Sequence, residues 1–207
     1  PGTVGIMAPP FLYLASASPR RRDLLRQIGI EPEIVPADVD ETRLAGEVPR
    51  AYVDRLARLK AETAWRALAE HRRSAVLAAD TAVVLGSEIF GKPADRDAAL
   101  DMLARLSGRT HEVITGVALK TARHLDLRVN VSRVTFRPLQ REECEAYWRT
   151  GEPCDKAGGY AVQGRAAVFI SELAGSFSGV MGLPLYETAE LLRAAGIDPL
   201  GHRGDGR

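Results

Sequence analysis

The sequence predicts an α/β protein of the mixed α+β kind, built around one mixed sheet. Apolar runs typical of strands alternate with stretches of helical periodicity, the strands include parallel-looking and hairpin-looking neighbours, and no linker divides the chain. With 207 residues, 45% of them hydrophobic, the chain can bury a sizeable core. We therefore expect one domain over residues 11–198, preceded by a flexible N-terminus at 1–10 and followed by a disordered tail at 199–207.

The first elements read as strand, helix, strand and loop. FLYLAS, residues 11–16, is an apolar run with β-forming aromatic residues. Pro19 then suits the first turn of a helix, and Gly29 suits the position just past its end. EIVPA, residues 33–37, predicts a second short strand, and DVDE, residues 38–41, has no periodicity and predicts a loop.

A long helix and a buried strand form the middle of the chain. Over residues 49–71 the apolar side chains fall on one helical stripe, and Lys60 falls on that stripe too. SAVLAADTAVVL, residues 74–85, is nearly continuous apolar sequence interrupted at Asp80 and Thr81. This pattern is typical of a buried central strand that carries polar groups to a site.

The remaining elements follow in order along the chain. We expect a turn into GKP (91–93), a helix over 95–107, neighbouring strands over 111–121 and 128–136, and a helix that ends at 151. A glycine-rich loop over 155–164, a strand over 166–173 and a last helix opened by Pro184 complete the chain.

Composition excludes several classes of protein. The 28 basic residues nearly cancel the 27 acidic ones, so net charge predicts neither a nucleic-acid partner nor a membrane surface. No apolar run approaches the ~20 residues of a membrane span, and the first residues lack the pattern of a signal peptide. Cys144 and Cys154 have neither CxxC spacing nor nearby histidines, which argues against zinc and disulfides. We expect a cytoplasmic protein.

The stretch LASASPRRRDLL, residues 14–25, places three arginines where a helix begins. A helix N-terminus has unpaired N–H groups and a partial positive charge, so positive side chains there favour binding of an anion such as phosphate. Arg20, Arg21 and Arg22 face different directions, and at least one of them should be an ordinary surface residue.

Other charged residues allow more than one interpretation. Lys60 on the apolar stripe either has a buried partner or reaches water with its amine, and Lys92 in the GKP turn resembles a surface lysine. Asp80 inside an apolar run must be paired, cap a neighbour, bind a metal or act in acid/base chemistry. Beside a cationic site, the carboxylates of the 38–41 loop suggest a divalent metal shared with a polyphosphate.

Two glycine-rich stretches are weak signals by themselves. In DKAGGYAVQG (155–164) the glycines permit close approach, and the Gln163 amide offers both a donor and an acceptor to the edge of a base. GSFSGVMGLP (175–184) is equally ambiguous, and the P-loop and GxGxxG fingerprints are absent. We interpret His111 and His124 as structural. The residues alone thus predict a phosphate-rich, metal-dependent site, but no reaction.

Six stretches taken together resemble one family. LASASPRRRDLL, DVDE, AADTAVVL with GKP, LSGRTHEVITGVAL, DKAGGYAVQG and GSFSGVMGLPLYET follow in order between about residue 11 and residue 192, and they resemble the Maf family of nucleoside triphosphate pyrophosphatases. The resemblance implies cleavage between the α- and β-phosphates with Mg²⁺ or Mn²⁺. It also implies an elongated mixed sheet flanked by helices, two lobes around a nucleotide-binding cleft, and a homodimer.

The resemblance assigns a role to each candidate residue. Asp80 resembles the proton acceptor, Glu41 its acidic partner, and both are candidate metal ligands. Arg20, Arg21, Lys60 and Lys92 resemble the residues that clamp the triphosphate, and Lys92 is also a catalytic candidate. Ser16 and Ser18 resemble residues that add hydroxyl contacts, and Asp155 and Lys156 resemble the polar floor of the site. Arg22 is the arginine that we expect to be expendable.

Thr81, Gln163 and Arg20 are the expected specificity residues. Thr after Asp80 and Gln at 163 resemble the branch that acts on dTTP and UTP, because an amide can pair with the O4 and N3–H edge of a pyrimidine. The branch that acts on 7-methyl-GTP tends to carry Gln and Glu at these positions. A 7-methyl-GTP pyrophosphatase is therefore the alternative enzyme, and a non-catalytic regulator of septum formation is the alternative of another class.

Overall fold

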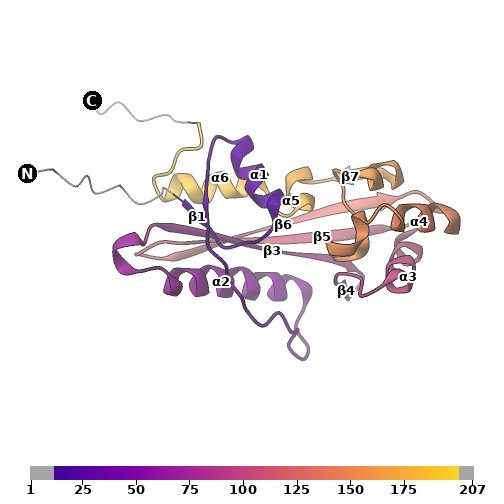
Figure 1. Ribbon diagram of the computed structural model, residues 1–207, viewed down its shortest axis with the longest axis horizontal. Helices are drawn as coiled ribbons and strands as arrows, with labels where there is room; N and C mark the ends of the chain where they lie inside the picture. Colours follow the sequence, from indigo (N-terminus) through magenta and orange to yellow (C-terminus); the bar gives the residue numbers. More distant parts are fainter. Residues whose placement is uncertain (1–11, 201–207) are drawn as a thin grey trace, which may run out of the picture.

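The computed structural model describes residues 12–200 and shows an elongated mixed α/β molecule (Figure 1). Within this part of the chain, seven strands form one sheet in the order β2-β1-β3-β5-β6-β7, with β4 also paired to β3. The strands are β1 (Leu12–Leu14), β2 (Glu33–Ile34), β3 (Ala75–Leu85), β4 (Glu88–Phe90), β5 (Thr110–Lys120), β6 (Leu125–Phe136) and β7 (Ile170–Ala174). The expected flexible N-terminus at 1–10 and residues 201–207 of the expected tail lie outside the described residues.

The sheet is mixed, as expected. β1 pairs parallel to both β2 and β3, whereas β3, β5, β6 and β7 pair antiparallel in succession. The neighbouring strands predicted over 111–121 and 128–136 are confirmed as β5 and β6.

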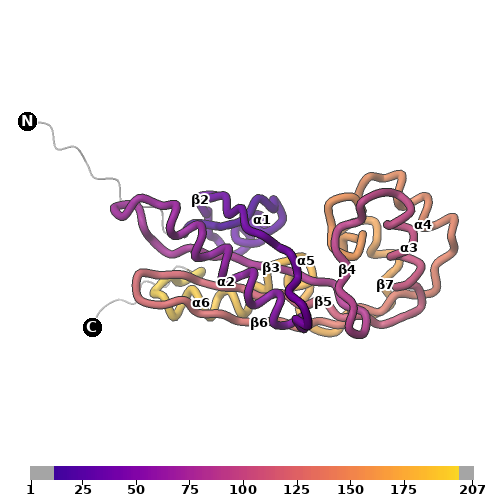
Figure 2. The backbone as a smooth tube through the Cα atoms, turned by 90° about the horizontal axis from the view of Figure 1, so that it is seen from below, coloured from indigo at the N-terminus to yellow at the C-terminus, as the bar shows by residue number. Residues whose placement is uncertain are grey.

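Helices cover both faces of the sheet and one end of it. The α-helices are α1 (Pro19–Gln27), α2 (Pro49–Ala67), α3 (Arg96–Leu106), α4 (Arg141–Trp148), α5 (Phe177–Met181) and α6 (Leu185–Ala194). α2 lies on one face, and α1, α5 and α6 lie on the other (Figure 1). α3 and α4 lie together at the far end of the molecule (Figure 2). Among the residues described, no helix combines the length and apolar character that crossing a membrane would require.

Several helix boundaries follow the local signals. Pro19 occupies the first turn of α1, and Gly29, with φ +80°, lies just past its end. Gly108 and Gly151 also have positive φ after α3 and α4, as expected of residues that end helices.

Other predictions were wrong in detail. The long helix ends at Ala67 rather than 71, because Leu68 is extended and turns its side chain into the core. β4 and α5 were not predicted, and both are very short. Of the expected strand over 166–173, only residues 170–173 belong to a strand, because Arg165–Phe169 forms a 3₁₀ turn.

A gap in one edge of the sheet positions the site. β1 accompanies β3 only as far as Leu77, and β4 joins the same edge from Val83. Between them, residues 79–82 have no neighbouring strand on that side within the described range 12–200. Asp80 and Thr81 lie in this gap, with side chains on opposite faces of the sheet.

Gly116 of β5 lets α2 approach the sheet closely. It pairs with Asp80 across the β3–β5 ladder. A Cβ added at Gly116 would lie 2.9 Å from the Val53 carbonyl oxygen of α2, so no other residue fits there without a shift. The buried alanines on this side of the helix, such as Ala57 and Ala61, are equally small.

Candidate active site

A cleft of about 560 Å³ opens at the gap between β1 and β4. Every candidate residue of the sequence analysis lines it: Ser16, Ser18, Arg20, Arg21, Glu41, Lys60, Asp80, Thr81, Lys92, Asp155, Lys156 and Gln163. These residues come from the start of α1, the 38–41 loop, α2, β3, the turn after β4 and the 155–164 loop. The fold therefore gathers segments that are far apart in the sequence.

Lys60 joins two carboxylates on the α2 side of the sheet. Its Nζ lies 2.7 Å from Asp80 Oδ1 and 2.6 Å from Glu41 Oε1. The side chains of Lys60 and Asp80 are 12% and 9% exposed, whereas that of Glu41 is 56% exposed. Of the two interpretations of Lys60, the buried partner is the correct one.

Burial and neighbouring charges act on the two carboxyl groups in different ways. Desolvation raises the pKa of Asp80, although the charges of Lys60 and Arg21 oppose this. Partial burial also acts to raise the pKa of Glu41, but the hydrogen bond and charge of Lys60, together with the charges of Lys92 and Arg21, outweigh it and lower that pKa. A carboxylate with a raised pKa beside a fixed cation is suited to acid/base chemistry.

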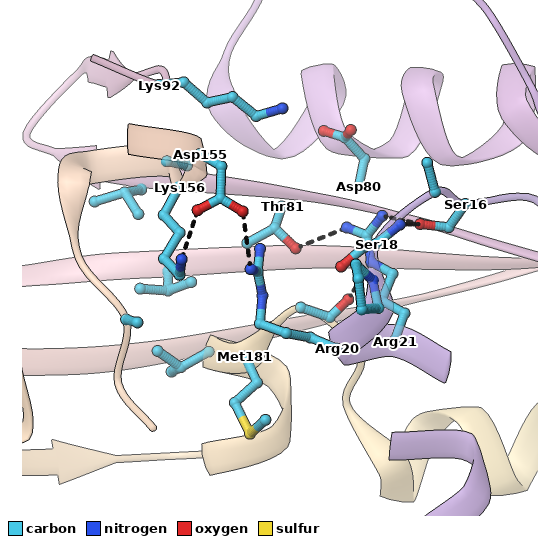
Figure 3. A pocket seen from close by; sticks show the side chains of 18 of the residues that line it. Ser16, Ser18, Arg20, Arg21, Asp80, Thr81, Lys92, Asp155, Lys156 and Met181 are labelled. Atoms are coloured by element: carbon cyan, nitrogen blue, oxygen red, sulfur yellow. Dashed lines mark hydrogen bonds and ion pairs between the residues drawn. The ribbon is translucent and has the colours of Figure 1, made fainter. Parts of the chain in front are cut away.

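Arg21 organises the opposite face of the strand. Its Nε donates to the Gly182 carbonyl at 2.8 Å, and its two terminal nitrogens donate to Ser16 Oγ and Thr81 Oγ1, each at 3.3 Å (Figure 3). Burial lowers the pKa of Arg21, and the charge of Asp80 opposes this. The guanidinium therefore fixes the start of α1, β3 and the end of α5 to one another.

The other two arginines separate as expected. Arg20 extends across the cleft to Asp155 at 3.4 Å, and Asp155 contacts the Lys156 amine at 2.5 Å (Figure 3). Arg22 turns away and pairs with Glu31 at 2.6 Å. Arg22 is not among the residues that line the cleft.

Lys92 reaches into the cleft from the turn after β4. It is exposed, and its side chain extends toward the side on which Asp80 lies (Figure 3). The Gly158 N–H donates to the Gly91 carbonyl at 3.0 Å, so this turn is bonded to the 155–164 loop. This bond brings Lys92 and Lys156 to the same end of the cleft.

The wall beyond Thr81 is polar at its base and apolar above. Thr81 Oγ1 lies 3.0 Å from Thr115 Oγ1, and the Thr115 hydroxyl donates to the Gly179 carbonyl at 2.8 Å. The apolar part of the lining consists mainly of Val83, Val113, Val162, Val180 and Met181. Such a surface can receive a planar base.

Sequence reasoning missed the contribution of α5 to this wall. Val180, Met181 and Gly182 line the cleft, and Gly182 anchors Arg21. The only signal for them was the stretch GSFSGVMGLP, which was ambiguous.

The histidines and cysteines lie elsewhere. His111 is 2% exposed and bonds Tyr160 through Nε2 at 2.7 Å, and His124 pairs with Asp126 at 2.9 Å. Both cysteines are free. Over residues 12–200 no three His, Cys, Asp or Glu side chains form a group that could hold a metal ion.

Comparisons with known proteins show which family and which relatives the chain resembles. Residues 11–195 match the model of the family described as Maf-like protein. The dTTP/UTP pyrophosphatase of Alkalilimnicola ehrlichii is 53% identical over 192 residues, covering 91% of this chain and 95% of that protein. The dTTP/UTP pyrophosphatases of Aromatoleum aromaticum and Dechloromonas aromatica are 51% and 50% identical, covering 89% and 91% of this chain and 95% and 99% of theirs.

Among solved structures, the Staphylococcus aureus Ham1 protein is similar with a TM-score of 0.43 and 17% identity, covering 60% of this chain and 71% of that one. A likeness at this level has no bearing on function.

Proposed function

The chain belongs to the Maf-like protein family, and on that premise we propose that it is a dTTP/UTP pyrophosphatase. It hydrolyses a pyrimidine nucleoside triphosphate between the α- and β-phosphates and releases the monophosphate and pyrophosphate. The match over residues 11–195 also supports a single Maf-like domain over 11–198.

The observation that carries the proposal is the Lys60 bridge between Asp80 and Glu41 at the floor of the cleft. Lys60 occupies Asp80 Oδ1 and thereby orients the carboxylate. Asp80 acts as the base: it orients the attacking water and takes its proton. Lys60 remains beside Asp80 as the counter-charge, while Glu41 is the more exposed of the two acids.

The cations of the cleft hold the triphosphate. Arg20, Lys92 and Lys156 line the same cleft as the start of α1, where the backbone N–H groups and the helix dipole favour an anion. In the part of the chain that the structure describes, no side chain caps this helix end, and the first turn of the helix contains no acidic residue. Phosphate oxygens satisfy these groups and neutralise the arginine-rich start of the helix. Ser16 is committed to Arg21 and to the Ser18 N–H, so it positions the loop as well as facing the substrate.

Thr81 and Gln163 determine which base is accepted. Gln163 is exposed on the cleft wall next to Val162, and its amide can bond the O4 and N3–H edge of uracil or thymine. Thr81 lies at the base of the apolar wall and is fixed by Arg21 and Thr115. The names of the relatives support this pyrimidine assignment and do not favour 7-methyl-GTP.

Glu41 and Asp80 would hold a divalent cation, Mg²⁺ or Mn²⁺. The fit is supported by their donor chemistry, because two carboxylates converge on one cationic group, the Lys60 amine. Mg²⁺ usually binds one or two protein carboxylates and completes its coordination with water and phosphate oxygens. When bound, the ion would neutralise charge on the polyphosphate.

Figure 2 shows the part of the molecule with α1, α2 and α6 apart from the end with α3 and α4, and the lining of the cleft includes residues of α1 and α2 as well as of the turn after β4 and the 155–164 loop. We propose these parts as the two lobes around the nucleotide. A homodimer, a cytoplasmic location and a second role in septum formation stay predictions.

A substrate panel tests the proposed function. Purified protein with Mg²⁺ or Mn²⁺ should release pyrophosphate chiefly from dTTP and UTP among dTTP, UTP, CTP, dATP, GTP and 7-methyl-GTP. Asp80→Asn, which keeps the shape of the side chain but removes the base, should lower kcat by roughly 10²–10⁴ while nucleotide binding persists. Cleavage of 7-methyl-GTP alone would refute the pyrimidine assignment, and near-normal turnover by Asp80→Asn would refute the role of Asp80.

A further inference from the structure

The loop that carries Gln163 is held from behind by two side chains outside the cleft. Tyr147 belongs to α4, and Glu152 lies in the 3₁₀ turn that follows it. Neither residue lines the cleft. Tyr147 is 4% exposed, so its hydroxyl must find its partners within the protein.

Tyr147 and Glu152 form a chain of hydrogen bonds. The Tyr147 hydroxyl donates to Glu152 Oε1 at 2.6 Å and accepts from the Ala161 N–H at 3.1 Å. Glu152 Oε2 accepts from the Arg165 N–H at 3.0 Å, and Oε1 also accepts from the Ala166 N–H at 3.4 Å. The Glu152 carboxylate thus holds the backbone on both sides of Gln163. It holds Ala161 through the Tyr147 hydroxyl, and it binds the N–H groups of Arg165 and Ala166 directly.

The same turn also anchors the beginning of the loop. The Glu152 carbonyl accepts from the Lys156 amine at 2.9 Å. Gly164 lies directly against the Glu152 carboxylate, where an added Cβ would overlap the carboxylate oxygens. The bonds to Arg165 and Ala166 also explain the 3₁₀ turn found where the sequence predicted a strand.

We propose that Glu152 is a positioning residue for substrate discrimination, acting with Tyr147 to hold the backbone around Gln163 so that its amide meets the edge of the pyrimidine. This inference rests on the proposed function, and it deepens it. Glu152 contacts neither the substrate nor the reacting atoms, so its effect should appear in the choice of base and not in the handling of the triphosphate.

UTP and CTP provide the test, because they share sugar and triphosphate and differ only at the edge that Gln163 reads. We expect Glu152→Gln to lower the UTP-to-CTP ratio of kcat/KM about tenfold, since one amide cannot accept from both N–H groups and the tyrosine. Tyr147→Phe should shift the ratio in the same direction. In a Gln163→Ala background, Glu152→Gln should change the ratio no further, because both act through one contact.

Glu143→Gln is the matched control. Glu143 of α4 is likewise a carboxylate that accepts a backbone N–H, from Gln140 at 3.0 Å, and it pairs with Arg137 at 2.6 Å, but among residues 12–200 none of its hydrogen bonds reaches the 155–164 loop. It should lose thermal stability without a change in the UTP-to-CTP ratio. If Glu152→Gln and Tyr147→Phe lose only stability in the same way, or if Glu152→Gln multiplies the effect of Gln163→Ala, the positioning role is overturned.

A second readout separates this inference from the proposed function. Amide hydrogen exchange across residues 157–166 needs no turnover. We expect faster exchange of the Ala161 and Arg165 amides in Glu152→Gln, and no change in Glu143→Gln. If the wild-type protein cleaved neither UTP nor CTP, the proposed function would fail, and hydrogen exchange alone would test whether Glu152 positions the loop. Faster exchange in Glu152→Gln would then support the positioning of the loop by Glu152, and unchanged exchange would overturn it.

Discussion

His111 should make the protein sensitive to mild acid. Its imidazole is 2% exposed and stacks edge-on against Phe136 and Tyr160, and its ring nitrogen Nδ1 has no hydrogen-bond partner among residues 12–200. Burial lowers the pKa of His111 from 6.5 to about 4. The unfolded chain therefore binds a proton near pH 6.5, while the folded protein resists protonation until about pH 4.

The sign and size of the effect follow from this difference. Between the two pKa values the unfolded state binds more protons, so the free energy of unfolding decreases as the pH falls. The contribution from this one histidine is about 2 kcal/mol by pH 5 and about 3 kcal/mol by pH 4. Above about pH 7.5 it vanishes, because both states are then neutral.

Urea unfolding of the wild-type protein and His111→Gln at several pH values tests this reasoning. Glutamine can still bond the Tyr160 hydroxyl but does not titrate. The difference between the two free energies of unfolding should shift by about 2 kcal/mol between pH 7.5 and pH 5, in favour of the variant. His124→Gln, at a half-exposed histidine, is the control. A difference that is the same at pH 7.5 and pH 5 would refute the account of His111.

Three further predictions concern the cleft. Lys60→Met leaves the buried Asp80 carboxylate without its bonded cation, so it should lower the free energy of unfolding, measured in urea, by about 3 kcal/mol. An unchanged urea midpoint would contradict the ion pair between Lys60 and Asp80. Arg20→Ala should raise the KM for UTP about tenfold, whereas Arg22→Ala should leave it within about twofold; equal effects would contradict their separation. EDTA should abolish turnover and added Mg²⁺ or Mn²⁺ should restore it, and turnover that survives chelation would remove the metal from the mechanism.

The sequence predicted best what depends on local patterns. Asp80 and Thr81 stood out because they interrupt an apolar strand, and alternation then places them on opposite faces of the sheet. The start of α1 was equally clear from Pro19 and the three arginines. These signals need only a few neighbouring residues.

Features that depend on distant partners were less accessible. Lys60 allowed two interpretations because its carboxylate partners lie on a different strand and in a loop. Tyr147 and Glu152 gave no signal at all, since their function depends on backbone N–H groups that lie further along the chain. α5 was missed because its five residues are too few for a periodicity, and a side-chain cap from Ser176 defines where it begins.

Folding stability and catalysis both depend on the absence of a side chain at Gly116. Its missing side chain sets the separation between α2 and β5, and α2 carries Lys60 to the strand residue that pairs with Gly116, Asp80. A larger residue would push the helix outward, loosening the alanine-rich packing and drawing the ammonium away from the base in the same movement. Variants at this position therefore cannot trade folding stability against catalysis, because both decline together.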